Sequence, residues 1–442
     1  MFQFLRTILY TLLILCSLAA GLAACTSATA TPAPTPAPTP SLTVSTAQPL
    51  PPTAVPDTPI TLTLWLPTRF AQQDDSNPAY QVLQRQLDDF ASSADGTQSQ
   101  IVIKQDRGPG GLLDLLRTAS PVAPGVLPDV IALEAVDLET AARAGLLKPI
   151  GSQLPADLTD DLFPFARNLG TLNGELYGLV YSADIEHLAG NQLAGNSATP
   201  LPPTWSALLD EPRRYLFVVG GPGGGVSDAV VVHYLSAGGT FTDSNGQPAL
   251  DEQAVQTLLE TYLEAQTKGI LPGNLTQFNN ASDIWTAWRG NGNTLVDLTA
   301  SQFLSVETRL PELQYAALPS LDKVATPIGR GWAYAIVAND PRRQAAALRL
   351  LQHLLTPANA GEWTQAAGTL PGRAAALAAW DANAYTSFLR AELTQAQTAP
   401  SAAIMAVVSP PLRKAVDDVL AGRATPAEAA HTAALTVNVV KK

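Results

Sequence analysis

The stretch PDVIALEAVDLETAARAGLLKPI, residues 128–150, indicates the class of fold that the chain forms. Its first part, from Pro128 to Val136, is mostly apolar and short, which is typical of a strand buried on both faces. The following residues, 137–150, are expected to form a helix, and Gly145 stands where a helix commonly ends. A buried strand that leads directly into a helix is the repeating unit of α/β proteins.

The residues before this unit repeat the same order. Thr alternates with large apolar residues over Ile60–Pro67, which predicts a strand, and residues 99–106 predict another. Helices are expected over 77–92 and 110–120, the first with an apolar face at helical spacing. We therefore expect a largely parallel sheet with helices on its faces. The folded part, roughly 380 residues, is too long for one ordinary core and suits two or three.

The N-terminal residues 1–24 have the layout of a secretory signal peptide. Arg6 precedes an uncharged apolar run from Thr7 to Ala24. The residues Leu22–Cys25 resemble the lipobox of bacterial lipoproteins, in which the cysteine is acylated and becomes the mature N-terminus. Cys25 is therefore our candidate lipidation site, on the extracytoplasmic face of the cell membrane. An uncleaved transmembrane anchor is the alternative, because the run is about long enough to span a bilayer.

A tether follows the cysteine. Residues 25–58 consist mostly of Thr, Ala, Pro and Ser, a composition that favours extended polyproline II or disorder and buries no core. The two cysteines are Cys16 and Cys25, so the mature body contains no disulfide. The net charge of −12 argues against a nucleic-acid partner.

Motifs for catalysis, metals or cofactors are missing from the sequence. The four histidines, His187, His233, His353 and His431, are scattered and lack zinc-site spacing. The glycine-rich residues 220–228 lack the Lys-Ser/Thr ending of a phosphate loop. The acidic residues 243–252 fit a turn and a helix capped by Asp251 better than a calcium loop. We therefore expect no catalytic residue, no metal site and no cofactor.

Seven segments in order resemble the family 1 extracellular solute-binding proteins of ABC importers, of the maltose-binding-protein-like type. Each segment alone is degenerate, but together they cover nearly the whole body. The segments are residues 128–150, LNGELYGLVYSADIEHLAGN (172–191), LPPTWSALLD (201–210), 238–272, DIWTAWRGNGNTLVDLTAS (283–301), YAALPSLDKVATPIGRGWAYAIVA (315–338) and 339–373.

This resemblance implies a type II periplasmic-binding-protein fold, in which two discontinuous α/β lobes are joined by hinge strands. Carried onto this chain, the first lobe takes residues 58–180 with 319–364. The second lobe takes residues 181–318 with 365–442. The hinge strands would be Leu176–Ser182 and Leu313–Ser320, both of which are short extended runs.

The ligand of such a protein binds in the cleft between the lobes. Trp65 and Trp332 are our aromatic candidates, because flat rings suit the apolar faces of sugars and both residues stand near family motifs that contribute such rings. Trp332 follows Gly329 and Gly331, a pair expected to let the backbone bring the indole to the lip of the cleft. The further candidates stand at or just after strand ends, beside the first hinge strand, or in the last family segment. They are Arg69, Phe70, Asp137, Tyr181, Asp184, Thr299, Ser301 and Arg373. A core role or a surface role is the alternative for each.

The sequence thus predicts a monomeric, lipid-anchored binding protein that captures a small solute, a sugar in the first hypothesis, for ABC permease subunits. It is not expected to be an enzyme. A non-transport lipoprotein of the same fold, acting as a ligand sensor or a partner-binding module, is the alternative. Hydrolase activity is a third reading, which would require two cleft carboxylates at a workable separation.

Overall fold

The computed structural model describes residues 60–71, 77–93, 97–191, 200–288, 294–307, 309–310 and 312–440. They belong to one compact unit that runs from Thr58 to Lys442. The predicted signal peptide, Cys25 and the tether up to residue 58 lie outside the described residues. Within the described ranges, every helix is too short or too polar to cross a bilayer.

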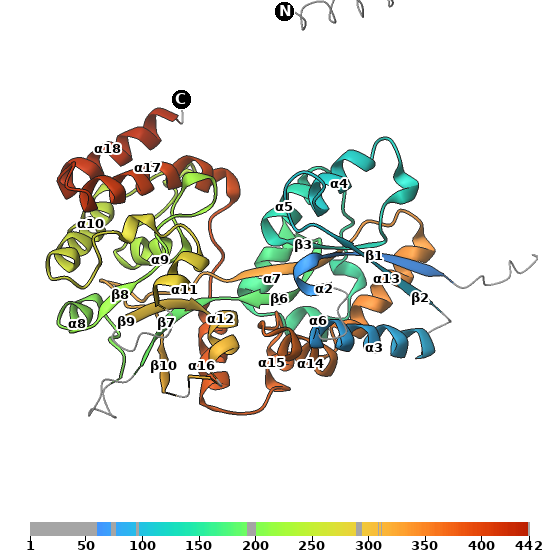
Figure 1. Ribbon diagram of the computed structural model, residues 1–442. Helices are drawn as coiled ribbons and strands as arrows, with labels where there is room; N and C mark the ends of the chain where they lie inside the picture. Colours follow the sequence, from blue (N-terminus) through green and yellow to red (C-terminus); the bar gives the residue numbers. More distant parts are fainter. Residues whose placement is uncertain are drawn as a thin grey trace, which may run out of the picture. The chain divides into compact units, whose positions relative to one another are not determined.

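Two sheets organise this unit (Figure 1). The first sheet has five strands in the order β2 (Gln98–Lys104), β1 (Thr61–Pro67), β3 (Val130–Glu134), β11 (Arg330–Ile336) and β6 (Gly178–Asp184). The second sheet has four strands in the order β10 (Leu313–Ala316), β7 (Glu186–Asn191), β9 (Thr294–Thr299) and β8 (Arg214–Leu216). A short hairpin joins β4 (Thr171–Leu172) to β5 (Glu175–Leu176).

The first sheet is mixed, which corrects the expectation of a largely parallel sheet. Strands β1, β2 and β3 are parallel, as predicted from the alternation of strand and helix. Strand β11 is antiparallel to both β3 and β6. It enters the sheet from a distant part of the chain, so the right-handed crossover rule for consecutive strands does not apply to it.

Helices cover both faces of the first sheet (Figure 1). Helices α4, α5 and α7 lie on one face, and α3, α13 and α14 lie on the other. The helices of the chain up to residue 170 are α2 (Thr68–Ala71), α3 (Pro78–Ser93), α4 (Leu112–Ala119), α5 (Ala135–Arg143), α6 (Ala156–Asp160) and α7 (Pro164–Gly170). Those that follow β11 in the chain include α13 (Pro341–Leu354), α14 (Pro357–Ala367), α15 (Ala374–Ala378) and α16 (Ala384–Gln395).

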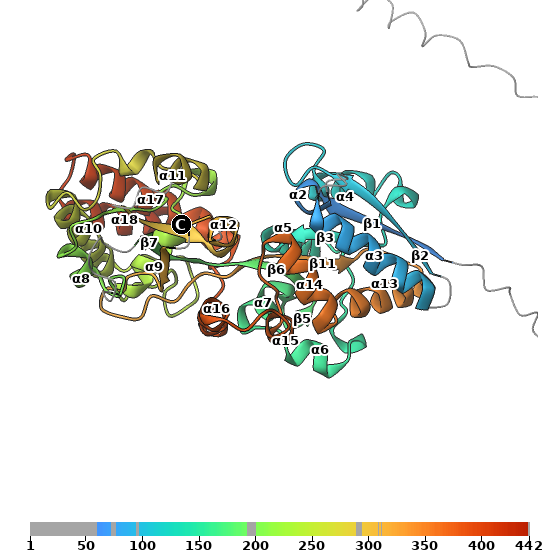
Figure 2. The ribbon, with the colours of Figure 1, turned by 60° about the horizontal axis from the view of Figure 1, so that its bottom comes forward.

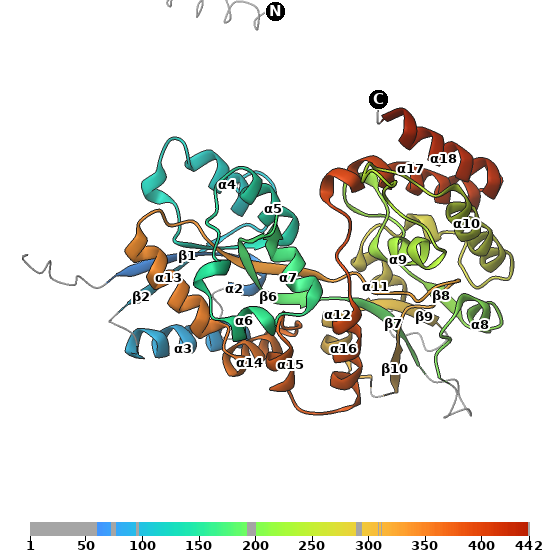
Figure 3. The same ribbon diagram turned by 180° about the vertical axis from the view of Figure 1, so that it is seen from behind.

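Around the second sheet, α10, α17 and α18 pack against one another, as the view from behind shows (Figure 3). The helices of this part are α8 (Trp205–Leu209), α9 (Asp228–Ser236), α10 (Glu252–Thr267), α11 (Ala281–Trp288), α12 (Ala300–Val306), α17 (Ala402–Leu420) and α18 (Pro426–Val440). The two sheets are connected most directly where β6 continues into β7 through the single residue Ile185 (Figure 2).

Two local predictions, the turn at residues 243–246 and the helix cap at Asp251, are confirmed. The Asp251 side chain caps α10 by accepting the Ala254 N–H at 2.8 Å, and Asp243 accepts the N–H groups of Asn245 and Gln247 in the preceding turn. His233 is buried among aromatic rings, with its Nδ1 atom 2.8 Å from the Tyr262 hydroxyl. Burial lowers the pKa of His233 to about 3, so this histidine is a neutral core residue at physiological pH.

Candidate functional site

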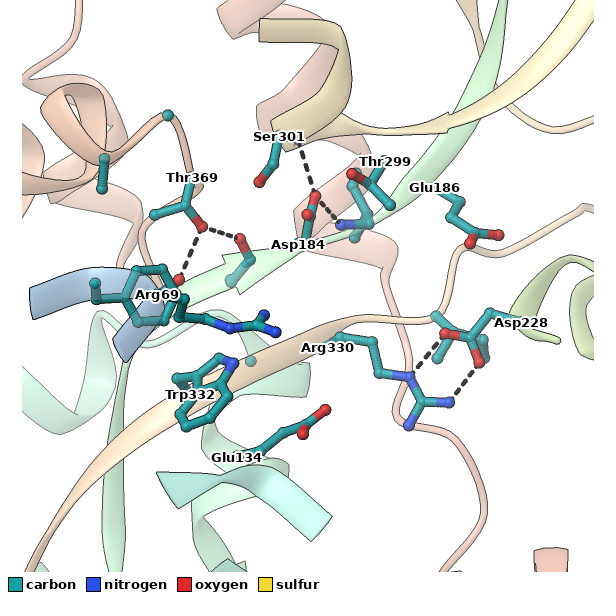
Figure 4. A pocket seen from close by; sticks show the side chains of 18 residues that line it. Arg69, Glu134, Asp184, Glu186, Asp228, Thr299, Ser301, Arg330, Trp332 and Thr369 are labelled. Atoms are coloured by element: carbon teal, nitrogen blue, oxygen red, sulfur yellow. Dashed lines mark hydrogen bonds and ion pairs between the residues drawn. The ribbon is translucent and has the colours of Figure 1, made fainter. Parts of the chain in front are cut away.

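A pocket of about 340 Å³ opens where strands of both sheets end (Figure 4). Its lining comes from α2, β3, β6, β7, β9, β11 and the starts or ends of three further helices. The residues that line it are Arg69, Phe70, Glu134, Ser182, Ala183, Asp184, Ile185, Glu186, Asp228, Thr299, Ser301, Ile328, Arg330, Gly331, Trp332, Ala367, Gly368 and Thr369. Its volume is within the range of small-molecule sites.

Trp332 reaches the pocket because of the alternation along β11. The strand reads RGWAYAI, with large side chains at Trp332 and Tyr334 and the small residues Gly331, Ala333 and Ala335 next to them. Alternate residues of a strand point to opposite faces, so the two rings lie on one face of the sheet. Trp332 is 6% exposed and meets Phe70 edge to face, with ring centroids 5.8 Å apart. It is therefore a packed wall of the pocket rather than a free ring at its lip.

The two glycines before Trp332 are needed for close packing. A Cβ atom at Gly329 would lie 2.2 Å from the Phe165 ring, and one at Gly331 would lie 2.9 Å from the Ser182 carbonyl oxygen. Neither distance is compatible with a side chain. These glycines therefore let β11 approach β6 and α7 closely, and this approach sets the position of Trp332.

Helix α2 contributes a cation to the same wall. The Arg69 guanidinium lies 5.2 Å from the centroid of the Trp332 ring, and its Nε donates a hydrogen bond to Asp106 Oδ2 at 2.6 Å. Figure 4 shows the end of the Arg69 side chain extending into the pocket beside the indole. This wall thus offers an aromatic face together with a hydrogen-bond donor.

Polar groups from both sheets meet at the end of β6. Asp184 Oδ1 accepts hydrogen bonds from the N–H groups of Ile185 at 3.0 Å and of Ser301 at 3.2 Å. Thr299 is the N-cap of α12 and forms a capping box with Gln302. Burial raises the pKa of Asp184, while the hydrogen bonds from Ser301 oppose that increase. The carboxylate therefore links a strand of the first sheet to the start of a helix on the second.

The segment after α14 closes the pocket beside β6. Gly368 ends the helix in the left-handed conformation, with φ of 62°, which a residue without a side chain adopts readily. Thr369 Oγ1 donates to the Ala183 carbonyl oxygen at 2.8 Å and lies 2.8 Å from the Ser182 hydroxyl. The two hydroxyls are thereby held next to the pocket.

An ion pair between Arg330 and Asp228 lies on the side of the pocket opposite Thr369 (Figure 4). Arg330 Nε donates to Asp228 Oδ2 at 2.7 Å, and its Nη2 contacts Asp228 Oδ1. Asp228 is the first residue of α9, where the helix dipole favours negative charge. Glu186 lies near this pair, and burial together with repulsion from Asp228 raises the pKa of Glu186 to about 8.

One protein family accounts for this arrangement. Its sequence profile, described as bacterial extracellular solute-binding protein, matches residues 114–361 of the chain, which is more than half of its length. The chain belongs to this family. Among curated proteins, no match is found.

Solved structures of solute-binding proteins have the same fold. The cyclic alpha-maltosyl-1,6-maltose binding protein of Arthrobacter globiformis has a TM-score of 0.67 at 18% identity, over 87% of this chain and 99% of that one. For a solute-binding protein of Thermotoga lettingae bound to alpha-D-tagatose, the TM-score is 0.63 and the sequence identity 21%, over 87% of this chain and 100% of that one. For the extracellular solute-binding protein of Staphylococcus aureus in complex with maltose, the TM-score is 0.66 and the sequence identity 16%, over 87% of this chain and 98% of that one. The predicted family and the two-lobed α/β fold class are confirmed.

In this extracellular solute-binding protein, the structure brings six of the predicted ligand contacts together. They line the one pocket described above and are Arg69, Phe70, Asp184, Thr299, Ser301 and Trp332. Their role as ligand contacts stays a prediction.

The other four predicted contacts lie outside the lining of the pocket. Trp65 is 5% exposed in β1, with Lys104 Nζ 5.1 Å from its ring centroid. Tyr181 is buried and stacks on Tyr334 with ring centroids 3.9 Å apart. Arg373 is buried and forms an ion pair with Asp161.

Asp137 requires a correction of its local structure. The strand expected over Pro128–Val136, which would place Asp137 directly at its end, stops at Glu134, and α5 begins at Ala135. Asp137 therefore lies in the first turn of a helix, where an acidic side chain is favoured by the helix dipole. Glu134, three residues earlier, holds the strand-end position that lines the pocket.

Sequence analysis missed several polar residues of the solute-binding pocket, which are Glu134, Ser182, Glu186, Asp228, Arg330 and Thr369. A signal was available for two of them. Arg330 stands between the two glycines that precede Trp332, and Asp228 ends the glycine-rich stretch 220–228.

Proposed function

We propose that this chain is the extracytoplasmic substrate-binding protein of an ABC importer and that its ligand is a small carbohydrate. The observation that supports this most directly is the combination of aromatic and hydrogen-bonding walls in one pocket. Phe70 and Trp332 supply apolar rings, while Arg69, Asp184, Ser301 and Thr369 supply donors and acceptors around them. A sugar ring has apolar C–H faces and a rim of hydroxyl groups, and it needs both kinds of wall.

Capture would follow from the way the pocket is assembled. We propose two lobes, one of residues 58–180 with 319–364 and one of residues 181–318 with 365–442. They would separate and close about the hinge strands expected from the sequence. Glu134 and Trp332 belong to the first sheet, and Thr299 belongs to the second, so a ligand in the pocket can contact both. Such a ligand favours the closed arrangement, because contacts with both parts exist only there. The protein itself carries no catalytic role in this proposal.

A screen of ligands by thermal shift tests the proposal. Sugars, polyols, amino acids and short peptides are added to the purified protein at several concentrations. We expect a mono- or oligosaccharide to raise the melting temperature, because ligand at about a hundred times its Kd contributes about 2.7 kcal/mol to stability. A shift with amino acids or peptides and none with any sugar would overturn the carbohydrate assignment.

We further propose that Cys25 carries lipid and holds the protein at the membrane, where monomers deliver the solute to permease subunits. The lipobox-like residues 22–25 and the Pro-rich tether after them support this. Cys25→Ser is expected to move the protein from the membrane fraction to the soluble fraction while leaving its thermal melting unchanged. A variant that stays in the membrane pellet would favour the transmembrane alternative for residues 7–24.

A further inference from the structure

The charged groups around the pocket are mostly matched in pairs. Asp106 accepts from Arg69, Glu134 contacts Arg107, and Asp228 accepts from Arg330. Two pocket carboxylates are left over, those of Asp184 and Glu186. Among the ion pairs of the described residues, none includes Asp184 or Glu186.

These two carboxylates differ in how their oxygens are satisfied. Asp184 accepts two backbone N–H groups through Oδ1. Glu186 Oε2 is buried and accepts no hydrogen bond from any described residue. A buried polar oxygen without a hydrogen-bond partner is costly whether its carboxyl is ionised or protonated, because it has lost its water and gained nothing in return. Glu186 is therefore the lining group that most needs a partner from outside the chain.

The surroundings of Glu186 specify the charge of that partner. The groups that act on its carboxyl are Asp184 from β6, Asp228 from α9, Asp297 from β9 and the Arg330 guanidinium from β11. Arg330 already makes two contacts with Asp228. Asp297 is buried and accepts the Tyr215 hydroxyl rather than a cation. Carboxyl groups thus outnumber cations at this end of the pocket. A positively charged group of a ligand would be attracted to it.

We propose that Glu186, with Asp184 and Asp228 beside it, binds an ammonium group of the ligand, so that the captured solute is an amino sugar. This inference rests on the proposed carbohydrate function of the same pocket. Trp332 and Glu186 lie on opposite sides of the space in Figure 4, so a sugar ring against the indole can present an amino group to the carboxylates. An ammonium group donates three hydrogen bonds and carries the charge that this end lacks.

A matched set of sugars tests the inference. Glucosamine, galactosamine, mannosamine and the disaccharide of glucosamine are each compared with their N-acetyl form and with the neutral parent sugar by isothermal titration calorimetry. The titrations are run at several pH values from slightly acidic to slightly alkaline. Burial raises the pKa of Glu186 to about 8, so an ammonium group that binds its carboxylate displaces the proton of that carboxyl. We expect at least one amino sugar to bind roughly tenfold or more tightly than both of its neutral counterparts, as a charge-assisted hydrogen bond implies.

Two variants locate the effect. Glu186→Gln keeps the size of the side chain and removes its charge, and it should reduce the preference for the amine to less than about threefold. Glu175→Gln, an exposed glutamate outside the pocket, should leave the preference unchanged. The comparison of sugars on the unaltered protein stands even where the Glu186 variant folds poorly.

The outcomes separate the two proposals. Neutral sugars that bind as tightly as their amines would overturn the inference and leave the carbohydrate function in place. A preference for amines that persists in Glu186→Gln would overturn the assignment to this residue. Failure of every sugar to bind, whether amine or neutral, would overturn the inference and the proposed function together.

Discussion

Replacing Trp332 with alanine is expected to weaken binding of the captured sugar by about thirtyfold, close to 2 kcal/mol. The indole forms an apolar wall of the pocket, and its loss removes both buried area and ring stacking on the ligand. The same variant should lose about 3 to 5 kcal/mol of unfolding free energy, because a large buried side chain leaves a cavity. Calorimetry and urea denaturation measure the two effects separately.

Trp65→Ala is the matched control for this variant. Trp65 belongs to the same sheet and is 5% exposed, against 6% for Trp332, but it lies outside the lining of the pocket. We expect a comparable loss of stability with ligand affinity unchanged. Trp332→Phe, which keeps an aromatic ring, should retain most of the binding. If Trp332→Ala binds the sugar as well as Trp65→Ala does, Trp332 has a packing role alone.

Arg373→Met should lower the free energy of unfolding by about 3 kcal/mol or more. Arg373 Nε donates to Asp161 Oδ2 at 2.9 Å, and the two terminal nitrogens donate to the carbonyl oxygens of Leu355 and Asp157. Its side chain is 6% exposed. Removing the cation leaves the Asp161 carboxylate partly buried with its charge uncompensated. Affinity for the sugar should stay within about threefold of the unaltered protein, because Arg373 is not part of the pocket.

Arg423→Met provides the comparison. Arg423 also pairs with an aspartate, Asp418, and its Nε–Oδ1 distance is likewise 2.9 Å, but its side chain is 59% exposed. An exposed pair of this kind contributes less than about 1 kcal/mol, so this variant should unfold almost like the parent. Equal losses for the two arginine variants in chemical denaturation would show that burial does not determine the value of the Arg373 pair.

Part of the pocket was predictable because local rules place its residues. Thr299 is the last residue of β9 and Ser301 lies two residues beyond it, and side chains at strand ends gather at the edge of an α/β sheet. Trp332 could be singled out because the alternation of β11 and the preceding glycines are both visible in sequence. The prediction for Asp137 used the same strand-end rule, but the strand ends two residues earlier than expected.

Burial of charge could not be predicted in the same way. Arg373 and Arg330 are both arginines that follow a glycine, and nothing in their neighbours distinguishes them. Arg373 is enclosed by Asp161 and the carbonyl oxygens of Asp157 and Leu355, while Arg330 pairs with Asp228 beside the pocket. Their partners are separated from them by 212 and 102 residues, respectively. Such pairs depend on chain segments that meet only after folding.

The sequence by itself determined the elements, the family and the aromatic wall, because strand alternation, helical periodicity and capping act over a few neighbouring residues. Asp251 as a cap and Trp332 on the large-residue face of its strand are examples. The tertiary structure decided which polar groups share the pocket and which carboxylate lacks a partner. Glu186 is left without a donor because three parts of the chain converge there, namely the continuous strands β6 and β7, helix α9 and strand β11. That convergence removes water and sets the local charge.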